Sequence, residues 1–251
     1  MNASSPPNGS ARTLDPAEVE RFSRLSEQWW DPKGKMAPLH KINPHRIAYI
    51  RDAACRMFER NPKSLNCLSG LRILDIGCGA GLLCEPLARL GAQVVGVDPS
   101  HTNIAIAKAH ADKSHLAIDY RCAIVEDLNP IERFDIVMAM EVVEHVADLG
   151  HFLDCCAALT KPKGFMSIAT LNRTWKSFAL AIVGAEYILR WLPRGTHQWD
   201  KFVKPEELDA HLVRNGFEVT EQTGLVYNPL GDRWTLSGDM DVNYMQIAAR
   251  P

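Results

Sequence analysis

The sequence lacks three features that mark membrane, secreted or nucleic-acid-binding proteins. None of its apolar runs reaches the roughly 20 residues that a membrane-spanning helix needs. Its seven cysteines are odd in number and include no Cys-x-x-Cys pair, which argues against a disulfide framework and predicts a reducing compartment. The formal net charge of -2 provides no general basic field, so we expect no nucleic-acid partner.

The N-terminus also lacks a recognisable targeting signal. Residues 1–14 are rich in Ser, Pro, Asn and Gly, without an apolar signal core or an Arg-rich amphipathic pattern, so we expect a disordered tail there. A cytoplasmic location is expected, in a bacterium rather than in an organelle matrix. The 46% hydrophobic content suffices for one sizeable core, and residues 15–251 are expected to form a single domain.

Two helical patterns open this domain, within residues 15–62. Asp15-Pro16 predicts the start of one amphipathic helix, and Asn43-Pro44 predicts the start of a second. From Leu71 onward, short apolar runs alternate with helical stretches, which indicates parallel βαβ units and an α/β fold. We predict a doubly wound, mostly parallel sheet of seven strands, at residues 71–75, 93–97, 118–121, 134–140, 164–171, 217–226 and 241–249.

A glycine-rich turn follows the first predicted strand. Gly77, Gly79 and Gly81 have the spacing GxGxG, which lets a ligand approach the backbone and the following helix. A dinucleotide fingerprint would need a third glycine where Leu82 stands. Asp98 ends the second strand, where its carboxylate can accept hydrogen bonds from both hydroxyls of a ribose. The pattern favours a nucleoside cofactor other than NAD over an ordinary turn in which Asp98 caps a helix.

These motifs resemble the class I S-adenosylmethionine-dependent methyltransferases, in which an acid precedes GxGxG and another acid ends the second strand. The resemblance implies S-adenosylmethionine as the cofactor. Methyl transfer from its sulfonium is an in-line displacement that mainly requires alignment with the acceptor. The cofactor-binding residues that the resemblance implies are Asp75, Gly77, Gly79, Gly81, Asp98 and Met140.

Three polar side chains follow the fourth predicted strand. Glu141, Glu144 and His145 have i, i+3, i+4 spacing, so a helical turn would present them on one face. One interpretation is a magnesium site that binds an acceptor hydroxyl and lowers its pKa. A second makes Glu141 and His145 catalytic, with His145 as a general base. In a third, the three residues only orient loops.

Stretches outside the generic cofactor fold resemble the ubiquinone-biosynthesis O-methyltransferase family. The resemblance implies O-methylation of polyprenylated hydroxyphenols and demethylubiquinol, with other proteins of that pathway as partners. It also implies magnesium bound through Glu141, Glu144 and His145, and an ion pair between Arg46 and the cofactor carboxylate. The similarity covers residues 22–245 and is carried by Trp29-Trp30-Asp31 and by 38–46, 170–173, 183–190, 195–197 and 241–245.

Residues 174–200 have the character of an insertion after the fifth strand. A helix from Trp175 would carry one apolar stripe, which suits either a membrane interface or the core of the protein itself. The family resemblance favours the interface, so residues 175–192 are predicted to contact a membrane surface and to hold the protein there peripherally. The stripe consists of Trp175, Phe178, Ile182, Ala185, Leu189 and Leu192.

Two other functions stay open on the sequence. A methyltransferase of the same fold could modify a soluble small-molecule hydroxyl or amine, with the insertion as a closed lid. A non-catalytic, lipid-associated assembly subunit would keep the cofactor for stability alone. The intact Asp75, GxGxG and Asp98 argue against this last function.

Overall fold

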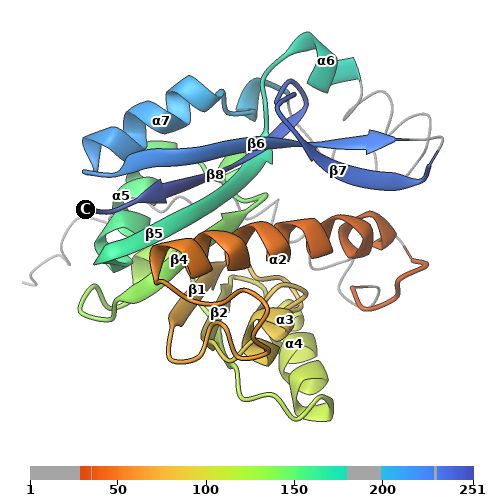
Figure 1. Cartoon of the computed structure of the whole chain (residues 1–251), viewed down its shortest axis with the longest axis vertical. Helices are drawn as coiled ribbons and strands as arrows, with labels where there is room; N and C mark the ends of the chain where they lie inside the picture. The colour runs from red at the N-terminus through yellow and green to blue at the C-terminus, as the bar shows by residue number, and fades with distance from the viewer. Residues whose placement is uncertain (1–28, 35, 180–198, 229–230) are drawn as a thin grey trace, which may run out of the picture.

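The computed structural model describes residues 29–34, 36–179, 199–228 and 231–251. The tail predicted at 1–14, the helix predicted from Asp15 and most of the insertion lie outside the described residues. The described chain forms one eight-stranded sheet with helices on both faces (Figure 1). Short 3-10 turns occur at Val125–Asp127 (η2), Val143–His145 (η3) and Trp199–Lys201 (η5).

Five parallel strands make up the first part of the sheet, in the order β3-β2-β1-β4-β5. Ile76 of β1 pairs with Val97 of β2 and Ala139 of β4, so the residues that follow these strands meet at one edge. Ligands of open parallel sheets bind at this carboxyl edge. The strand bounds are Arg72–Ile76 (β1), Gln93–Asp98 (β2), Asp119–Cys122 (β3), Phe134–Met140 (β4) and Thr160–Leu171 (β5).

Three antiparallel strands complete the sheet. Strand β8 (Asn243–Ala249) pairs with β5, β6 (Glu218–Asn228) pairs with β8, and β7 (Arg233–Ser237) pairs with β6 at the edge. The predicted α/β class and mostly parallel sheet are confirmed, with one strand more than the seven expected. The extra strand is β7, in which none of the five side chains is buried, so it carries no apolar pattern that would reveal it.

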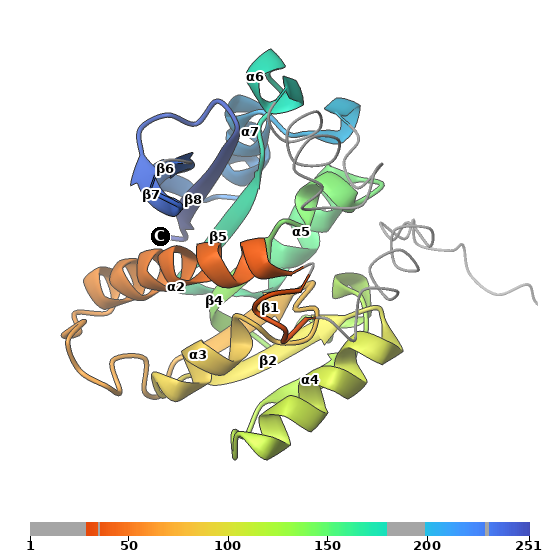
Figure 2. The ribbon, with the colours of Figure 1, turned by 90° about the vertical axis from the view of Figure 1, so that its right-hand side faces the viewer.

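Helices cover both faces of the sheet (Figure 2). Ile73 packs into the cluster on one face and its neighbour Leu74 into the cluster on the other, which explains why the parallel strands are apolar throughout. The first face carries α2 (Ala37–Met57), α3 (Cys84–Arg89) and α4 (His101–Lys113). The second carries α5 (Leu149–Leu159) and α7 (Pro205–Arg214).

Helix α2 begins earlier than the sequence predicts. It starts at Ala37, and Pro44 lies inside it. Proline has no N–H to donate to the preceding turn, a defect that costs about 3 kcal/mol in a helix interior. Ile42 and Ile50, on either side of Pro44, are buried against the sheet and offset this cost. The prediction that a helix starts at Asn43 is therefore wrong, because tertiary packing overrides the local start signal.

A short helix begins at Trp175, the residue at which the sequence predicts a helix. Helix α6 spans Trp175–Ser177, and the Thr174 hydroxyl accepts a hydrogen bond from the Ser177 backbone N–H at 3.0 Å. Residues 180–198, which contain most of the predicted apolar stripe, lie outside the described residues. Within the described ranges, no helix combines the length and apolarity needed to cross a membrane. All seven cysteines are described, and none forms a disulfide.

Candidate active site

The GxGxG turn connects β1 to α3 with a backbone that favours glycine. Gly77, Gly79 and Gly81 have φ angles of +70°, +54° and +87°. Space is restricted as well, since a Cβ added to Gly81 would lie 2.0 Å from the Tyr120 hydroxyl oxygen. One added to Gly77 would lie 2.6 Å from a methyl carbon of Val142. The turn therefore requires glycine both for its backbone conformation and for the close approach of Val142 and Tyr120, and of the three glycines Gly77 is the exposed one.

Asp98 ends β2 directly beside this turn. One carboxylate oxygen accepts a hydrogen bond from the Gly79 N–H at 3.0 Å, and the other accepts from the Ser100 N–H at 2.9 Å and the Asn103 amide at 3.2 Å. Burial raises the pKa of Asp98, and these three donors oppose that rise. Ser100, not Asp98, caps helix α4. Three of the roughly four acceptor positions of a carboxylate are thus in use, so Asp98 positions the turn and retains limited capacity for a ribose.

Asp75 lies below the turn. Its side chain is buried and accepts a hydrogen bond from the Cys84 thiol at 3.1 Å. Burial raises the pKa of Asp75 to about 7; the Cys84 contact opposes the rise and the nearby charge of Asp98 adds to it. Asp75 thus contacts the first residue of α3, and its contact with the cofactor stays a prediction.

Asp75 makes the stability of the protein depend on pH. Its pKa is higher in the folded state than the ordinary 3.8, so its stabilising contribution is complete below about pH 4 and is lost as the pH rises through 7. We expect the wild-type free energy of unfolding to fall by about 3–4 kcal/mol more than that of Asp75→Asn across this window. Urea unfolding between pH 4 and 8 tests this, with the exposed Asp112→Asn as control. Parallel curves for the wild type and Asp75→Asn would contradict the prediction.

Arg46 and Glu141 form the ion pair nearest to the predicted acceptor residues. Arg46 is buried in α2, and its Nη2 pairs with Glu141 Oε1, whose side chain is 27% exposed. Glu141 follows β4 with a left-handed φ of +60°, and its N–H donates to the Ala169 carbonyl at 2.9 Å. The Nε of Arg46 is buried without a hydrogen-bond partner. An anionic group on a ligand would satisfy this donor.

Glu144 is buried beside Glu141. Its Oε2 accepts a hydrogen bond from the Thr170 hydroxyl at 2.7 Å, and its Oε1 is buried without a hydrogen-bond partner. Burial raises the pKa of Glu144 well above its usual range, and the charge of Glu141 raises it further. Two carboxyl groups, one holding an unused acceptor, therefore lie together at the end of β4.

The predicted helical turn that presents Glu141, Glu144 and His145 together is wrong. The segment Val143–His145 is a 3-10 turn, and the left-handed Glu141 precedes it, so the side chains do not share the face of an α-helix. Glu144 is buried while His145 is half-buried. In the described part of the chain, no group of three His, Cys, Asp or Glu side chains is placed to hold a metal ion.

Met140 is the last residue of β4, and its side chain is buried at the same sheet edge as the glycine turn. The predicted residues lie on α2, β1, the β1–α3 turn, the ends of β2 and β4, and the segment from Glu141 through η3. The sequence reading assigned no site role to Tyr120, Asn103 or Trp29, which support Gly81, Asp98 and Gly79. Of these three residues, only Trp29 could have been found from the sequence, because it belongs to a stretch that carries the family resemblance.

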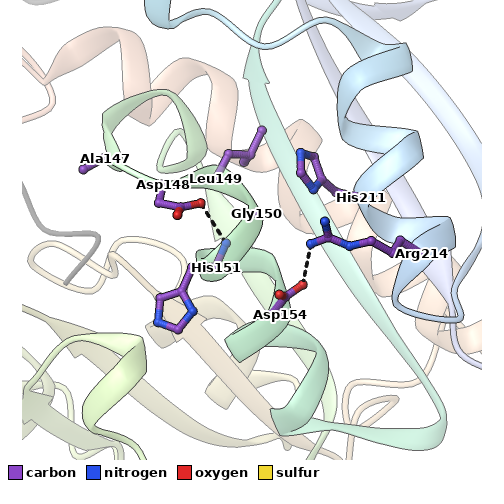
Figure 3. Close-up of a pocket in the computed structure, with 8 residues that line it drawn as sticks. All are labelled: Ala147, Asp148, Leu149, Gly150, His151, Asp154, His211 and Arg214. Atoms are coloured by element: carbon purple, nitrogen blue, oxygen red, sulfur yellow. Dashed lines mark hydrogen bonds and ion pairs between the residues drawn. The ribbon is translucent and has the colours of Figure 1, made fainter. Parts of the chain in front are cut away.

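A surface hollow of about 610 Å³ lies elsewhere, between the first turn of α5 and α7 (Figure 3). The Asp148 carboxylate accepts from the His151 N–H at 2.9 Å, and Arg214 pairs with Asp154 at 2.9 Å. Asp148 thus caps α5, and the pair between Arg214 and Asp154 joins α7 to α5. None of the predicted site residues lines the hollow, which we assign to packing between α5 and α7.

The sequence of this chain is similar to those of known methyltransferases. A family model described as a methyltransferase domain matches residues 43–222. A ubiquinone biosynthesis O-methyltransferase of Rhodopseudomonas palustris is 73% identical over 96% of this chain and 95% of its own length. The corresponding protein of Bradyrhizobium diazoefficiens is 72% identical over 94% of this chain and 93% of its own length. The chain belongs to the ubiquinone biosynthesis O-methyltransferase family.

Solved structures place this O-methyltransferase family member in a wider fold group. The magnesium protoporphyrin IX methyltransferase of Synechocystis, solved with bound S-adenosylmethionine, superposes with a TM-score of 0.65. It covers 96% of this chain and 100% of its own at 17% identity. The N-methyltransferase NodS of Bradyrhizobium japonicum superposes with a TM-score of 0.57 at 14% identity, over 94% of this chain and 97% of its own. At such identities the likeness concerns the fold alone.

Proposed function

We propose that this protein transfers a methyl group from S-adenosylmethionine to phenolic hydroxyls of polyprenylated hydroxyphenol and demethylubiquinol intermediates of ubiquinone biosynthesis. The observation that carries the proposal is the 73% identity to a ubiquinone biosynthesis O-methyltransferase across 96% of the chain. Such identity extends beyond the cofactor turn to the segments that follow β4 and β5, where an acceptor would bind. The GxGxG turn beside Asp98 fits the nucleoside of the methyl donor.

The cofactor supplies an activated methyl group on its sulfonium, so the protein has to align donor and acceptor. Gly77 leaves exposed backbone at the start of the turn, and Asp98 holds the turn at the Gly79 N–H. The unpartnered Nε of Arg46 is available to the cofactor carboxylate. His145 is proposed to accept the proton of the acceptor hydroxyl as that oxygen attacks the methyl carbon.

Magnesium is included in the proposal. Proteins usually bind this ion through one or two carboxylates, with substrate oxygens and waters as the other ligands. The adjacent Glu141 and Glu144 fit that donor set, because Glu144 Oε1 is a buried oxygen without a partner. The ion would be held by these two residues, without the predicted third ligand His145, and would lower the pKa of the acceptor hydroxyl.

Turnover with a short-chain demethylubiquinol and labelled S-adenosylmethionine tests the function and the metal together. We expect methyl transfer that EDTA lowers at least tenfold and magnesium restores, an effect of about 1.4 kcal/mol on the barrier. Glu144→Gln keeps an acceptor for Thr170 and is expected to lose the response to magnesium. No product in the presence of magnesium would reject the acceptor class, and full activity in EDTA would reject the metal.

A second part of the proposal concerns the membrane. Three aromatic rings lie at the two ends of the insertion: Trp175 stacks on Trp199 with centroids 5.3 Å apart, and Phe178 meets both rings edge-on. Trp175 is 77% and Phe178 38% exposed. Aromatic side chains favour the membrane–water interface, where a polyprenylated acceptor resides. We therefore propose peripheral attachment through 175–192 from the bacterial cytoplasm, where other ubiquinone-biosynthesis proteins would be partners.

Replacing Trp175 and Phe178 together by aspartate is expected to weaken liposome binding. Each large apolar side chain contributes about 1.5–3 kcal/mol on burial, so a loss of at least tenfold should follow. Flotation with liposomes that contain anionic lipid measures it. Ile131→Asp is the matched control, since Ile131 is 85% exposed and lies away from the insertion. Equal flotation of both variants would contradict the membrane proposal.

A further inference from the structure

Trp29 lies directly on the centre of the glycine turn. A Cβ added to Gly79 would be 2.6 Å from Cη2 and 2.9 Å from Cζ2 of this indole, so the benzene edge of Trp29 is in contact with the Gly79 backbone. The first described residues, drawn in red in Figure 2, lead directly into α2. The Nε1 of Trp29 is buried and has no hydrogen-bond partner.

Several contacts hold the Trp29-Trp30 pair in this position. The Trp29 carbonyl oxygen lies 2.8 Å from His40 Nε2 of α2, and the Trp30 indole N–H donates to the Ala80 carbonyl at 3.1 Å. Trp30 also stacks on His110 of α4, with ring centroids 3.5 Å apart and an interplanar angle of 3°. The pair therefore connects two helices to the turn that bears the cofactor motif.

His110 is itself anchored. Its Nδ1 lies 2.5 Å from Oε1 of Glu85, a buried carboxylate at the start of α3. Stacking on an anchored ring fixes the plane of Trp30, and through the chain it fixes the place of Trp29. Covering an apolar surface would not require a fixed ring orientation. These contacts hold the Trp29 indole in one orientation over Gly79.

A buried N–H without an acceptor is unfavourable, and such groups commonly mark a missing ligand. We propose that Trp29 and Trp30 form a clasp over bound S-adenosylmethionine, in which Trp29 Nε1 donates to an oxygen of the cofactor and Trp30 holds the clasp closed. The inference rests on the proposed function and adds a cofactor-positioning residue to it. Water is excluded from the donor side of the site when the clasp is closed.

Titration calorimetry with S-adenosylhomocysteine tests the clasp without requiring an acceptor. Trp29→Phe keeps an aromatic ring on Gly79 but removes the N–H, so we expect about tenfold weaker binding. Trp30→Phe keeps the stack on His110 and loses the bond to Ala80, with a smaller loss of about threefold. Trp234→Phe on β7 is the matched control and should bind like the wild type.

Further readouts separate positioning from folding. The thermal unfolding temperature of unliganded Trp29→Phe should equal or exceed that of the wild type, because the variant no longer buries an unpaired N–H. In the methyl-transfer assay its KM for S-adenosylmethionine should rise about tenfold while kcat changes less than twofold. Unchanged affinity of Trp29→Phe would overturn the clasp. Failure of the wild type to bind S-adenosylhomocysteine would instead overturn the proposed function.

Discussion

Gly81→Ala is expected to weaken S-adenosylmethionine binding about 100-fold or more, a loss of roughly 3 kcal/mol. Two physical effects combine. A non-glycine residue in the left-handed region costs about 1–2 kcal/mol, and the φ of Gly81 is +87°. The added Cβ would also lie 2.0 Å from the Tyr120 hydroxyl oxygen, so the turn or β3 must shift. Titration calorimetry measures the loss of affinity for the cofactor, and thermal unfolding measures the loss of stability.

Two further variants separate backbone strain from the steric clash. Gly216 has a φ of +79° and nothing within 4 Å of an added Cβ, so Gly216→Ala carries strain alone and should bind the cofactor normally. Tyr120→Phe removes a hydroxyl that is buried without a partner, and should restore part of the affinity of Gly81→Ala. Equal binding by Gly81→Ala and Gly216→Ala would show that the contact with Tyr120 does not shape the turn.

Arg46→Ala is expected to cause the second large loss, in both stability and turnover. Removing one partner of a buried ion pair costs about 3–5 kcal/mol, and the partial exposure of Glu141 places the expected value near 3 kcal/mol. The two adjacent carboxyl groups then lie together without a cation. We expect kcat/KM for S-adenosylmethionine to fall about 100-fold, mainly through KM if Nε binds the cofactor carboxylate.

Arg51→Ala is the matched control on the same helix. Arg51 pairs with its neighbour Asp52 in a partly exposed bridge, and exposed pairs contribute about 0–1 kcal/mol. Arg46→Lys keeps the charge but loses the planar fork, so it should restore stability better than cofactor affinity. An unchanged KM for S-adenosylmethionine in Arg46→Ala would exclude the cofactor contact and leave Arg46 as a structural partner of Glu141.

Local signals predicted the glycine turn and the strands around it well. Glycines at 77, 79 and 81 report a backbone conformation that depends on a few neighbouring residues, and apolar runs report strands that are buried on both faces. Asp98 is equally local, because the end of a parallel strand determines where its side chain lies. The order of these elements along the chain was sufficient to predict the α/β class and the mostly parallel sheet.

Contacts between distant segments were beyond the sequence pattern. Arg46 and Glu141 are 95 residues apart, and only the packing of α2 against the sheet brings them together. The left-handed backbone of Glu141 is imposed by its N–H bond to β5, which a helical spacing rule ignores. Trp29 reaches Gly79 across 50 residues for the same reason. Edge strand β7 was missed because exposed residues need no periodic pattern.

Pro44, which interrupts the hydrogen bonding of α2, divides that helix into two mechanically distinct parts. It cannot donate to the carbonyl of His40, the residue that contacts Trp29, so residues 37–43 are joined to the rest of the helix more weakly than an uninterrupted helix would allow. Ile42, before Pro44, and Ile50, beyond it, both pack against the sheet, and Arg46 pairs with Glu141 from the longer part. The contact between His40 and Trp29 therefore depends more on the packing of Ile42 than on a continuous ladder of helical hydrogen bonds.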